Sequence, residues 1–281
     1  MTASSVPPLT VDHVTKTYAS RVRGRGSFHA CEDVSFEITP GAAVSLVGAS
    51  GSGKSTLAKI ITGVEHPSSG SIRFGDVGVG KLRGKALRSY RSDVQMVFQD
   101  PYGALNPLHT VEYMVGRPLQ NFLKMPAARA RDRITELLET VGLAPAGQFL
   151  GKLPHQLSGG QRQRVVIARA LAADPKLIVA DEPASMLDVS LRAGVLDLLV
   201  KLRVDHGLSL LYITHDLLSA RVVTDEILVL HEGKLVERGN TKRVLQNPQD
   251  AYTVQLLDAI PNPFAAGDAA PPASTAADDG R

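Results

Sequence analysis

Short apolar runs separated by amphipathic stretches are the main pattern along this chain. Residues 42–47 (AAVSLV), 177–180 (LIVA) and 208–214 are almost continuously apolar, which is typical of strands covered on both faces. Residues 34–38 (VSFEI) alternate apolar and polar positions, which predicts a strand with one buried face in an antiparallel sheet. Another strand is expected over residues 9–16. The pattern therefore predicts antiparallel strands first and buried parallel strands later.

Helical periodicity fills the intervals between the buried strands. From Val195 onward, apolar residues recur at i, i+3, i+4 and i+7, which predicts a helix over residues 190–206 with one apolar face. A second helix is expected over residues 55–62. Strands that alternate with helices predict an α/β fold around a mostly parallel sheet.

The middle of the chain, about residues 101–160, lacks strand signals. Apolar residues repeat with helical spacing from Ile134, and Gly142 is well placed to end that helix. This stretch is interpreted as a helical subdomain inserted into the α/β core.

Composition narrows the class of protein without naming a function. The 281 residues carry 31 Lys and Arg against 28 Asp and Glu, a net charge of +3, and include one cysteine. A charge this small is weak evidence for nucleic-acid binding, and one cysteine forms no internal disulfide or multi-cysteine metal site. No apolar run reaches the length of a membrane span, and the first residues do not resemble a secretory signal. The expectation is a soluble, cytoplasmic protein.

One short segment, residues 21–26 (RVRGRG), is rich in Arg and Gly. Composition favours a solvated hairpin loop. A patch that contacts phosphates or a membrane surface is the alternative.

A phosphate-binding loop is the strongest chemical signal. Residues 48–55 (GASGSGKS) fit G-x-x-x-x-G-K-[ST] between an apolar strand and a helix, the context that the motif requires. Backbone N–H groups and the helix N-terminus would hold phosphate oxygens. Lys54 would reach the β- and γ-phosphates, and the Ser55 hydroxyl would bind Mg²⁺. The expected ATP contacts here are Gly48, Ser50, Gly51, Gly53, Lys54, Ser55 and Thr56.

A Mg-ATP site also needs an acidic element in addition to the phosphate loop. The run LIVA is followed by Asp181 and Glu182, so two carboxylates stand at the end of a buried strand. Asp181 is placed to hold Mg²⁺ or its waters. Glu182 would polarise a water for attack on the γ-phosphate.

The segment LSGGQ at residues 157–161 precedes a strongly helical run. Ser158 and Gln161 have the spacing of a capping box, so a well-capped helix is the simplest interpretation. The same exposed N–H groups, with Gly159 and Gly160 adding no bulk, would also grip a phosphate. Because the chain already has one phosphate loop, this second grip would serve a nucleotide bound by another chain.

The phosphate loop, LSGGQ, LIVADEP and Ile213-Thr214-His215-Asp216 together resemble the nucleotide-binding subunits of ABC transporters, a pattern that covers nearly all of residues 9–261. The resemblance implies a RecA-like core and a head-to-tail dimer of two ATPase subunits. Each of two ATP molecules would lie between the phosphate loop of one subunit and the signature of the other.

Further residues take roles from the resemblance alone. Tyr18 would stack on adenine, Gln99 would sense Mg²⁺ and the attacking water, and His215 would bond the γ-phosphate. Asp188 belongs to the loop that crosses the dimer interface, where Met186 and Ala184 replace the usual Ala and Thr. The expected Mg²⁺ residues are Ser55, Gln99 and Asp181.

Two stretches resemble the ATPases of dipeptide, oligopeptide and nickel importers: residues 98–107 (FQDPYGALNP) and 247–261 (NPQDAYTVQLLDAIP). The resemblance implies a second ATP-binding subunit, identical or related, two membrane permease subunits and an extracytoplasmic binding protein. The chain would then lie on the cytoplasmic face of the membrane, held there by the permeases. Alternatives are a nickel or other small-solute importer, a soluble ATPase that acts on nucleic acid or ribosomes, or a catalytically inactive regulatory module.

These signals together predict the organisation of the chain. Residues 1–100 and 161–240 would form the two parts of the ATPase core, and residues 101–160 the helical subdomain with the signature at its end. Residues 241–262 would form a C-terminal helical extension of the peptide-importer type. The Ala-, Pro- and Asp-rich residues 263–281 are expected to be a disordered tail.

Overall fold

A computed structural model describes residues 6–19 and 26–260 of the chain. The Arg-rich residues 21–25 and the expected disordered tail at 263–281 lie outside the described residues. The one cysteine, Cys31, is fully buried.

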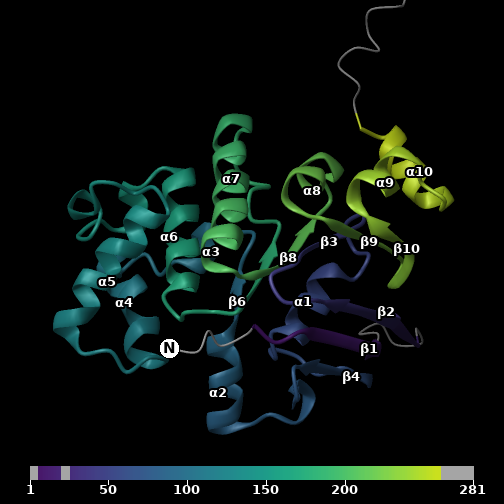
Figure 1. The fold of residues 1–281 in the computed structure, drawn as a ribbon, viewed down its shortest axis with the longest axis horizontal. Helices are drawn as coiled ribbons and strands as arrows, with labels where there is room; N and C mark the ends of the chain where they lie inside the picture. The colour runs from purple at the N-terminus through teal and green to yellow at the C-terminus, as the bar shows by residue number, and fades with distance from the viewer. Residues whose placement is uncertain (1–5, 20–25, 261–281) are drawn as a thin grey trace, which may run out of the picture.

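Two sheets form the centre of the molecule (Figure 1). The first is antiparallel, in the order β2-β1-β4-β5. Its strands are β1 (Leu9–Ala19), β2 (Ser27–Ile38), β4 (Ser69–Phe74) and β5 (Val77–Gly78). The second has the order β10-β9-β3-β8-β7-β6 and is parallel except for the β9–β10 hairpin. Its strands are β3 (Ala43–Val47), β6 (Val94–Val97), β7 (Leu177–Asp181), β8 (Ser209–Thr214), β9 (Glu226–His231) and β10 (Lys234–Asn240).

Helices surround the sheets at both ends of the molecule (Figure 1). The helical lobe contains α3 (Pro101–Ala104), α4 (Val111–Asn121), α5 (Ala127–Thr140) and α6 (Gly159–Leu171). The remaining helices are α1 (Lys54–Ile61), α2 (Gly84–Asp93), α7 (Val189–His206), α8 (Leu217–Val223), α9 (Thr241–Gln246) and α10 (Ala251–Asp258). Figure 1 places α4 and α5 at one end and α9 and α10 at the other.

The continuously apolar runs form strands that are buried on both faces, as predicted. All residues of β3, β7 and β8 are buried. Along β7, Ile178 and Ala180 face the core shared with the helical lobe, whereas Leu177 and Val179 face the core shared with α1 and the antiparallel sheet. Two apolar layers therefore hold one sheet between them, and the predicted α/β fold class is confirmed.

The first two strands are longer than expected. β1 continues past Lys16 to Ala19, and β2 begins at Ser27, seven residues before the alternating segment. Their ends pair with each other, Ala19 opposite Ser27, so backbone hydrogen bonds extend both strands beyond their apolar positions. Side-chain alternation marks only the half of such a hairpin that covers the core.

The parallel register brings three loops to one edge of the sheet. Val47 pairs with Thr214, and Asp181 pairs with Ile213. Gly48, Glu182 and His215 therefore emerge side by side at the carboxyl ends of β3, β7 and β8, where open α/β sheets bind ligands. Among the residues that the structure describes, no helix has the length and hydropathy needed to cross a membrane.

Candidate functional site

The loop between β3 and α1 contains two glycines, Gly48 and Gly53. Neither could be replaced by another residue without a shift of the backbone. A Cβ at Gly48 would lie 2.2 Å from the carbonyl oxygen of Leu230. Gly53 has φ +105°, and its Cβ would lie 1.9 Å from the carbonyl oxygen of Ala30. The loop is thus pressed against two neighbouring strands, which fixes its path around the space above α1.

Lys54 is the central cation of this loop. Its side chain is buried, and Nζ donates to the carbonyl oxygens of Gly48 at 2.7 Å and Ala49 at 2.8 Å. Burial lowers the pKa of Lys54, while the charges of Glu182 and Asp181 act in the opposite direction. A poorly solvated ammonium group held by neutral carbonyls is well suited to bind a polyanion.

Asp181 is a buried carboxylate beside the loop. It is 8% exposed. Burial raises the pKa of Asp181, and a hydrogen bond from Ser55 opposes that rise. A carboxylate and a hydroxyl are hard oxygen ligands, the kind that Mg²⁺ prefers. The residues present therefore fit a magnesium ion, which would also offset the cost of the buried charge.

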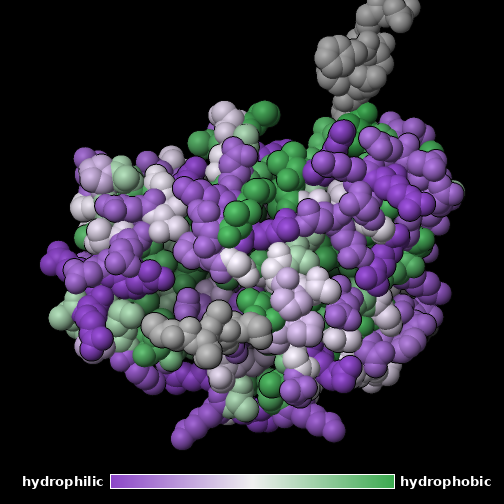
Figure 2. Space-filling view, in the orientation of Figure 1, coloured by the Kyte–Doolittle hydropathy of each residue, from purple (hydrophilic) through white to green (hydrophobic). Residues whose placement is uncertain are grey.

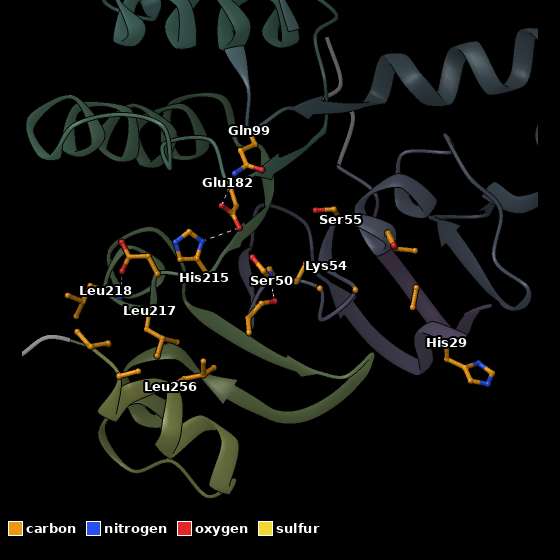
Figure 3. Close-up of a pocket in the computed structure, with 18 of the residues that line it drawn as sticks. His29, Ser50, Lys54, Ser55, Gln99, Glu182, His215, Leu217, Leu218 and Leu256 are labelled. Carbon is orange, nitrogen blue, oxygen red and sulfur yellow. Dashed lines mark hydrogen bonds and ion pairs between the residues drawn. The ribbon is translucent and has the colours of Figure 1, made fainter. Parts of the chain in front are cut away.

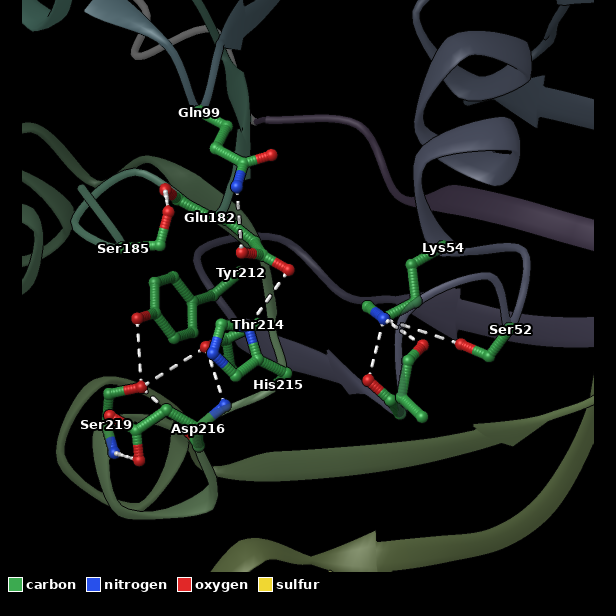
Figure 4. A network of polar contacts seen from close by, with 12 residues as sticks. Ser52, Lys54, Gln99, Glu182, Ser185, Tyr212, Thr214, His215, Asp216 and Ser219 are labelled. Atoms are coloured by element: carbon green, nitrogen blue, oxygen red, sulfur yellow. Dashed lines mark hydrogen bonds and ion pairs between the residues drawn. The ribbon is translucent and has the colours of Figure 1, made fainter.

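Glu182 is held by two side chains from separate elements (Figure 4). The Gln99 amide donates to Oε2 at 3.2 Å, and Nδ1 of His215 lies 3.1 Å from Oε1. Glu182 has φ +46°, and its N–H donates to the carbonyl oxygen of Ile213 at 2.8 Å. Positive φ is strained in a non-glycine residue, so the surrounding contacts hold this carboxylate in one place.

These elements border one pocket of about 1050 Å³ (Figure 3). The residues predicted from sequence that line it are Tyr18, Ser50, Gly51, Gly53, Lys54, Ser55, Thr56, Gln99, Glu182 and His215. Asp181 and Gly48 do not line the pocket, but each directly precedes a residue that does, Glu182 and Ala49. The structure therefore brings residues from five separate segments of the chain to a single cavity.

The aromatic end of the pocket contains Phe28, a residue that no sequence motif indicates. Tyr18 lies at the end of β1, with Phe28 of β2 at 5.7 Å between ring centroids, and both line the pocket. Phe28 is 56% exposed. An exposed Phe opposite Tyr18 in the paired strands would have been the signal, but it required the register of β1 and β2.

The LSGGQ segment is placed differently. Ser158 caps α6: its Oγ accepts the Gln161 N–H at 3.2 Å, and the Gln161 side chain accepts the Ser158 N–H at 3.0 Å. The predicted capping box is confirmed. None of the described residues 158–161, Gly159 and Gly160 included, lines the chain's own pocket.

Asp188 also lies outside that pocket, as the N-cap of α7. The hydrogen bond from the Leu191 N–H, at 2.9 Å, lowers the pKa of Asp188. The neighbouring Met186 is 56% exposed, whereas Ala184 is buried. The departure at position 186 therefore changes the surface of this loop, and the departure at 184 changes its interior.

Comparison with known proteins shows where this geometry recurs. The sequence model described as "ABC transporter" matches residues 31–185, more than half of the chain. The chain belongs to the ABC transporter family. It is an ATPase of the kind that this family uses, and the predicted ATPase activity and family are confirmed.

Curated relatives within the family are ATP-binding proteins of transport systems. The chain is 45% identical to the oligopeptide transport ATP-binding protein OppF of Lactococcus lactis over 233 residues, 83% of the chain and 72% of OppF. It is 46% identical to the peptidoglycan transport protein YejF of Agrobacterium fabrum over 85% of the chain, and 42% identical to the glutathione import protein GsiA of Escherichia coli K12 over 83%. The chain spans only 45% of YejF and 37% of GsiA.

Solved structures of the family have the same fold. The ATP-binding cassette MJ0796, in a dimeric post-hydrolysis state with ADP and Pi, is 34% identical and gives a TM-score of 0.73 over 83% of this chain and 98% of its own. CbiO1 of Clostridium perfringens, part of the complex cbiONQ, is 30% identical with a TM-score of 0.74 over 87% of this chain and 92% of its own.

Proposed function

We propose that this chain powers an importer of dipeptides or oligopeptides by binding and hydrolysing Mg-ATP. The observation that carries the proposal is the carboxylate of Glu182, held by Gln99 and His215 at the edge of a phosphate loop. A water-activating base needs this combination of fixed position and access to the γ-phosphate.

Each side of the pocket would contact a different part of the nucleotide. The adenine would stack on Tyr18, and the phosphates would lie in the loop of residues 48–55. Lys54 would neutralise the β- and γ-phosphates, and His215 would donate to the γ-phosphate. Ser55, Asp181 and Gln99 would hold Mg²⁺, which supplies charge neutralisation between the phosphates.

The second half of the site would come from another subunit. Ser158, Gly159, Gly160 and Gln161 form an N–H-rich helix start outside the chain's own pocket. In a head-to-tail dimer this helix start would meet the γ-phosphate held by the partner ATPase, identical or related. ATP would then favour the closed dimer, and hydrolysis would reopen it.

The transported substrate would be handled by other subunits. OppF supports a peptide importer, because the chain is 45% identical to it over 72% of its length. The helical lobe would pass the ATP-driven motion to two membrane permeases, and an extracytoplasmic binding protein would deliver the peptide. The chain would be a peripheral protein at the cytoplasmic face of the membrane.

Recovery of the chain from membranes tests this assembly. Tagged Glu182→Gln protein, trapped with Mg-ATP, is expected to co-purify with a second ATP-binding subunit and two permeases. Peptide uptake should then depend on the wild-type chain in the same cells. Recovery with ribosomes or nucleic acid and without permeases would overturn the proposal. If the chain were recovered with permeases but the cells took up nickel rather than peptides, the assignment of a peptide substrate would be wrong.

A further inference from the structure

The C-terminal helix α10 contacts the phosphate loop directly. The hydroxyl oxygen of Tyr252 accepts a hydrogen bond of 2.9 Å from the backbone N–H of Ala49. The two residues are 203 positions apart in the sequence. Ala49 follows Gly48, so α10 supplies an acceptor to the first peptide of the loop from outside the motif.

Tyr252 is fixed in position by its own neighbours. Its ring stacks on His231 at the end of β9, with 3.7 Å between centroids and 6° between planes. Its N–H is capped by Asp250 at 2.8 Å. The Glu237 carboxylate accepts the N–H groups of Gln249 at 2.8 Å and Asp250 at 3.2 Å. The hydroxyl is therefore presented to the loop by a segment anchored on β9 and β10.

Lys54 and Tyr252 hold opposite sides of the same peptide group. The carbonyl of Gly48 and the N–H of Ala49 belong to one planar unit and point in opposite directions. Lys54 Nζ donates to that carbonyl at 2.7 Å, and Tyr252 accepts from that N–H. When a loop lysine turns to the β- and γ-phosphates, the contact with Tyr252 remains on the N–H side of this peptide.

The position of this peptide indicates which phosphate it affects. Figure 3 shows Ser50 between Lys54 on one side and His215 and Leu256 on the other. Leu256, Ala259 and Ile260, which follow Tyr252 in the chain, also line the pocket. The first residues of the loop therefore line the same pocket as His215, the residue proposed to bond the γ-phosphate.

We propose that Tyr252 is a positioning residue for the phosphate loop, whose hydroxyl orients the Gly48–Ala49 peptide so that the loop binds the γ-phosphate of ATP. The inference rests on the nucleotide site proposed above. It assigns to the C-terminal extension a part in ATP binding, in addition to its packing against α8, β9 and β10.

Nucleotide titration of the full-length Tyr252→Phe protein tests the inference. Phe keeps the ring and its stack on His231 and removes only the hydroxyl. Loss of one hydrogen bond should weaken Mg-ATP binding about 3- to 10-fold, measured by isothermal titration. ADP binding should change less, because ADP lacks the γ-phosphate. A merely structural role would not alter the ratio of the ATP and ADP affinities.

A matched control is available in the helical lobe. The Tyr113 ring also stacks on a histidine, His109, at 4.1 Å between centroids, and Tyr113 does not line the pocket. Tyr113→Phe should bind both nucleotides as the wild type does, and Lys54→Ala should bind ATP weakly. Wild-type ATP affinity in Tyr252→Phe would overturn the inference alone. Equal loss of ATP and ADP binding with a lower Tm would also overturn it. Wild-type ATP binding by Lys54→Ala would overturn the nucleotide site itself.

Discussion

The phosphate-loop region and the LSGGQ region both end in a helix start, α1 and α6, yet they are built differently. At the phosphate loop, the side chains of Ser52, Lys54 and Asp181 are buried, and neighbouring strands leave no room for a Cβ at Gly48 or Gly53. At the signature, Ser158 is exposed and its contacts are local, within one capping box.

The difference indicates that the phosphate loop and the signature have separate roles in the site. The phosphate loop is supported from β2, β9 and α10, so one chain is sufficient to shape it. Residues 158–161 of the signature form a capped helix start that does not line this pocket, as expected if they serve the nucleotide of a second subunit in the proposed dimer.

Removal of the charge on Glu182 should have the largest effect. Glu182→Gln keeps the side-chain shape but removes the general base, so kcat should fall by about 10²- to 10⁴-fold. ATP binding and the ATP-bound dimer should persist, as shown by titration and size-exclusion chromatography. Glu139→Gln, an exposed position on α5, is the control. Unchanged turnover in Glu182→Gln would contradict the assignment of the base.

Loss of Lys54 should affect binding within one chain. Charge-assisted hydrogen bonds contribute about 1.5–3 kcal/mol each, so Lys54→Ala should weaken Mg-ATP binding by roughly 10- to 100-fold. Lys201→Ala, on the exposed face of α7, should bind normally. Because the phosphate loop is the half that a single chain completes, this loss should appear even in the monomer. An effect confined to the dimer would break the comparison between the two regions.

Ser158→Ala should weaken dimerisation and leave ATP binding by a single chain unchanged. Removal of an N-cap costs about 1 kcal/mol of stability, and it also removes a hydroxyl from the surface offered to the partner's nucleotide. ATP binding by the monomer should be unchanged, whereas ATP-dependent dimerisation should weaken in sedimentation experiments. Thr110→Ala, which removes the Thr110 cap on the Tyr113 N–H, should lose similar stability without affecting dimerisation. Equal dimerisation in the two variants would mean that Ser158 serves only its helix.

The sequence predicted the elements whose signal is local. β3, β7 and β8 were predicted because both of their faces are apolar, and the capping box of α6 because its two residues are three positions apart. β6 was missed: it has four residues, and only Val94 and Val97 are buried. The short strands β4 and β5 carry too few apolar positions for a pattern to emerge.

The site divides in the same way. The motif contains the loop and its lysine, so Gly48 and Lys54 could be named before the fold was known. Phe28 and Tyr252 could not, because each becomes part of the site only through strand register or through a contact across most of the chain. Sequence motifs record the groups nearest the phosphates, whereas the residues that hold those groups are set by tertiary packing.

Asp181→Asn tests what the buried carboxylate of Asp181 costs the stability of the phosphate-loop region. This variant should have the smallest effect. Burial raises the pKa of Asp181, so the folded protein keeps that proton at a higher pH than the unfolded chain does. The free energy of unfolding therefore falls as pH rises from about 3.9, the ordinary value for Asp, to the raised pKa. At pH 7.5 the full penalty is present, and Asp181→Asn should be more stable than the wild type by about 0.5–2 kcal/mol in urea unfolding without Mg²⁺. At pH 4 the two proteins should unfold at similar urea concentrations, because the penalty is then largely absent.

The stabilised variant should also be stabilised less by Mg-ATP than the wild type is, because it lacks the carboxylate that would face the metal. If Asp181→Asn were instead less stable than the wild type at pH 7.5, the hydrogen bond from Ser55 would contribute more to stability than the burial of the charge costs. The buried carboxylate would then not destabilise the phosphate-loop region.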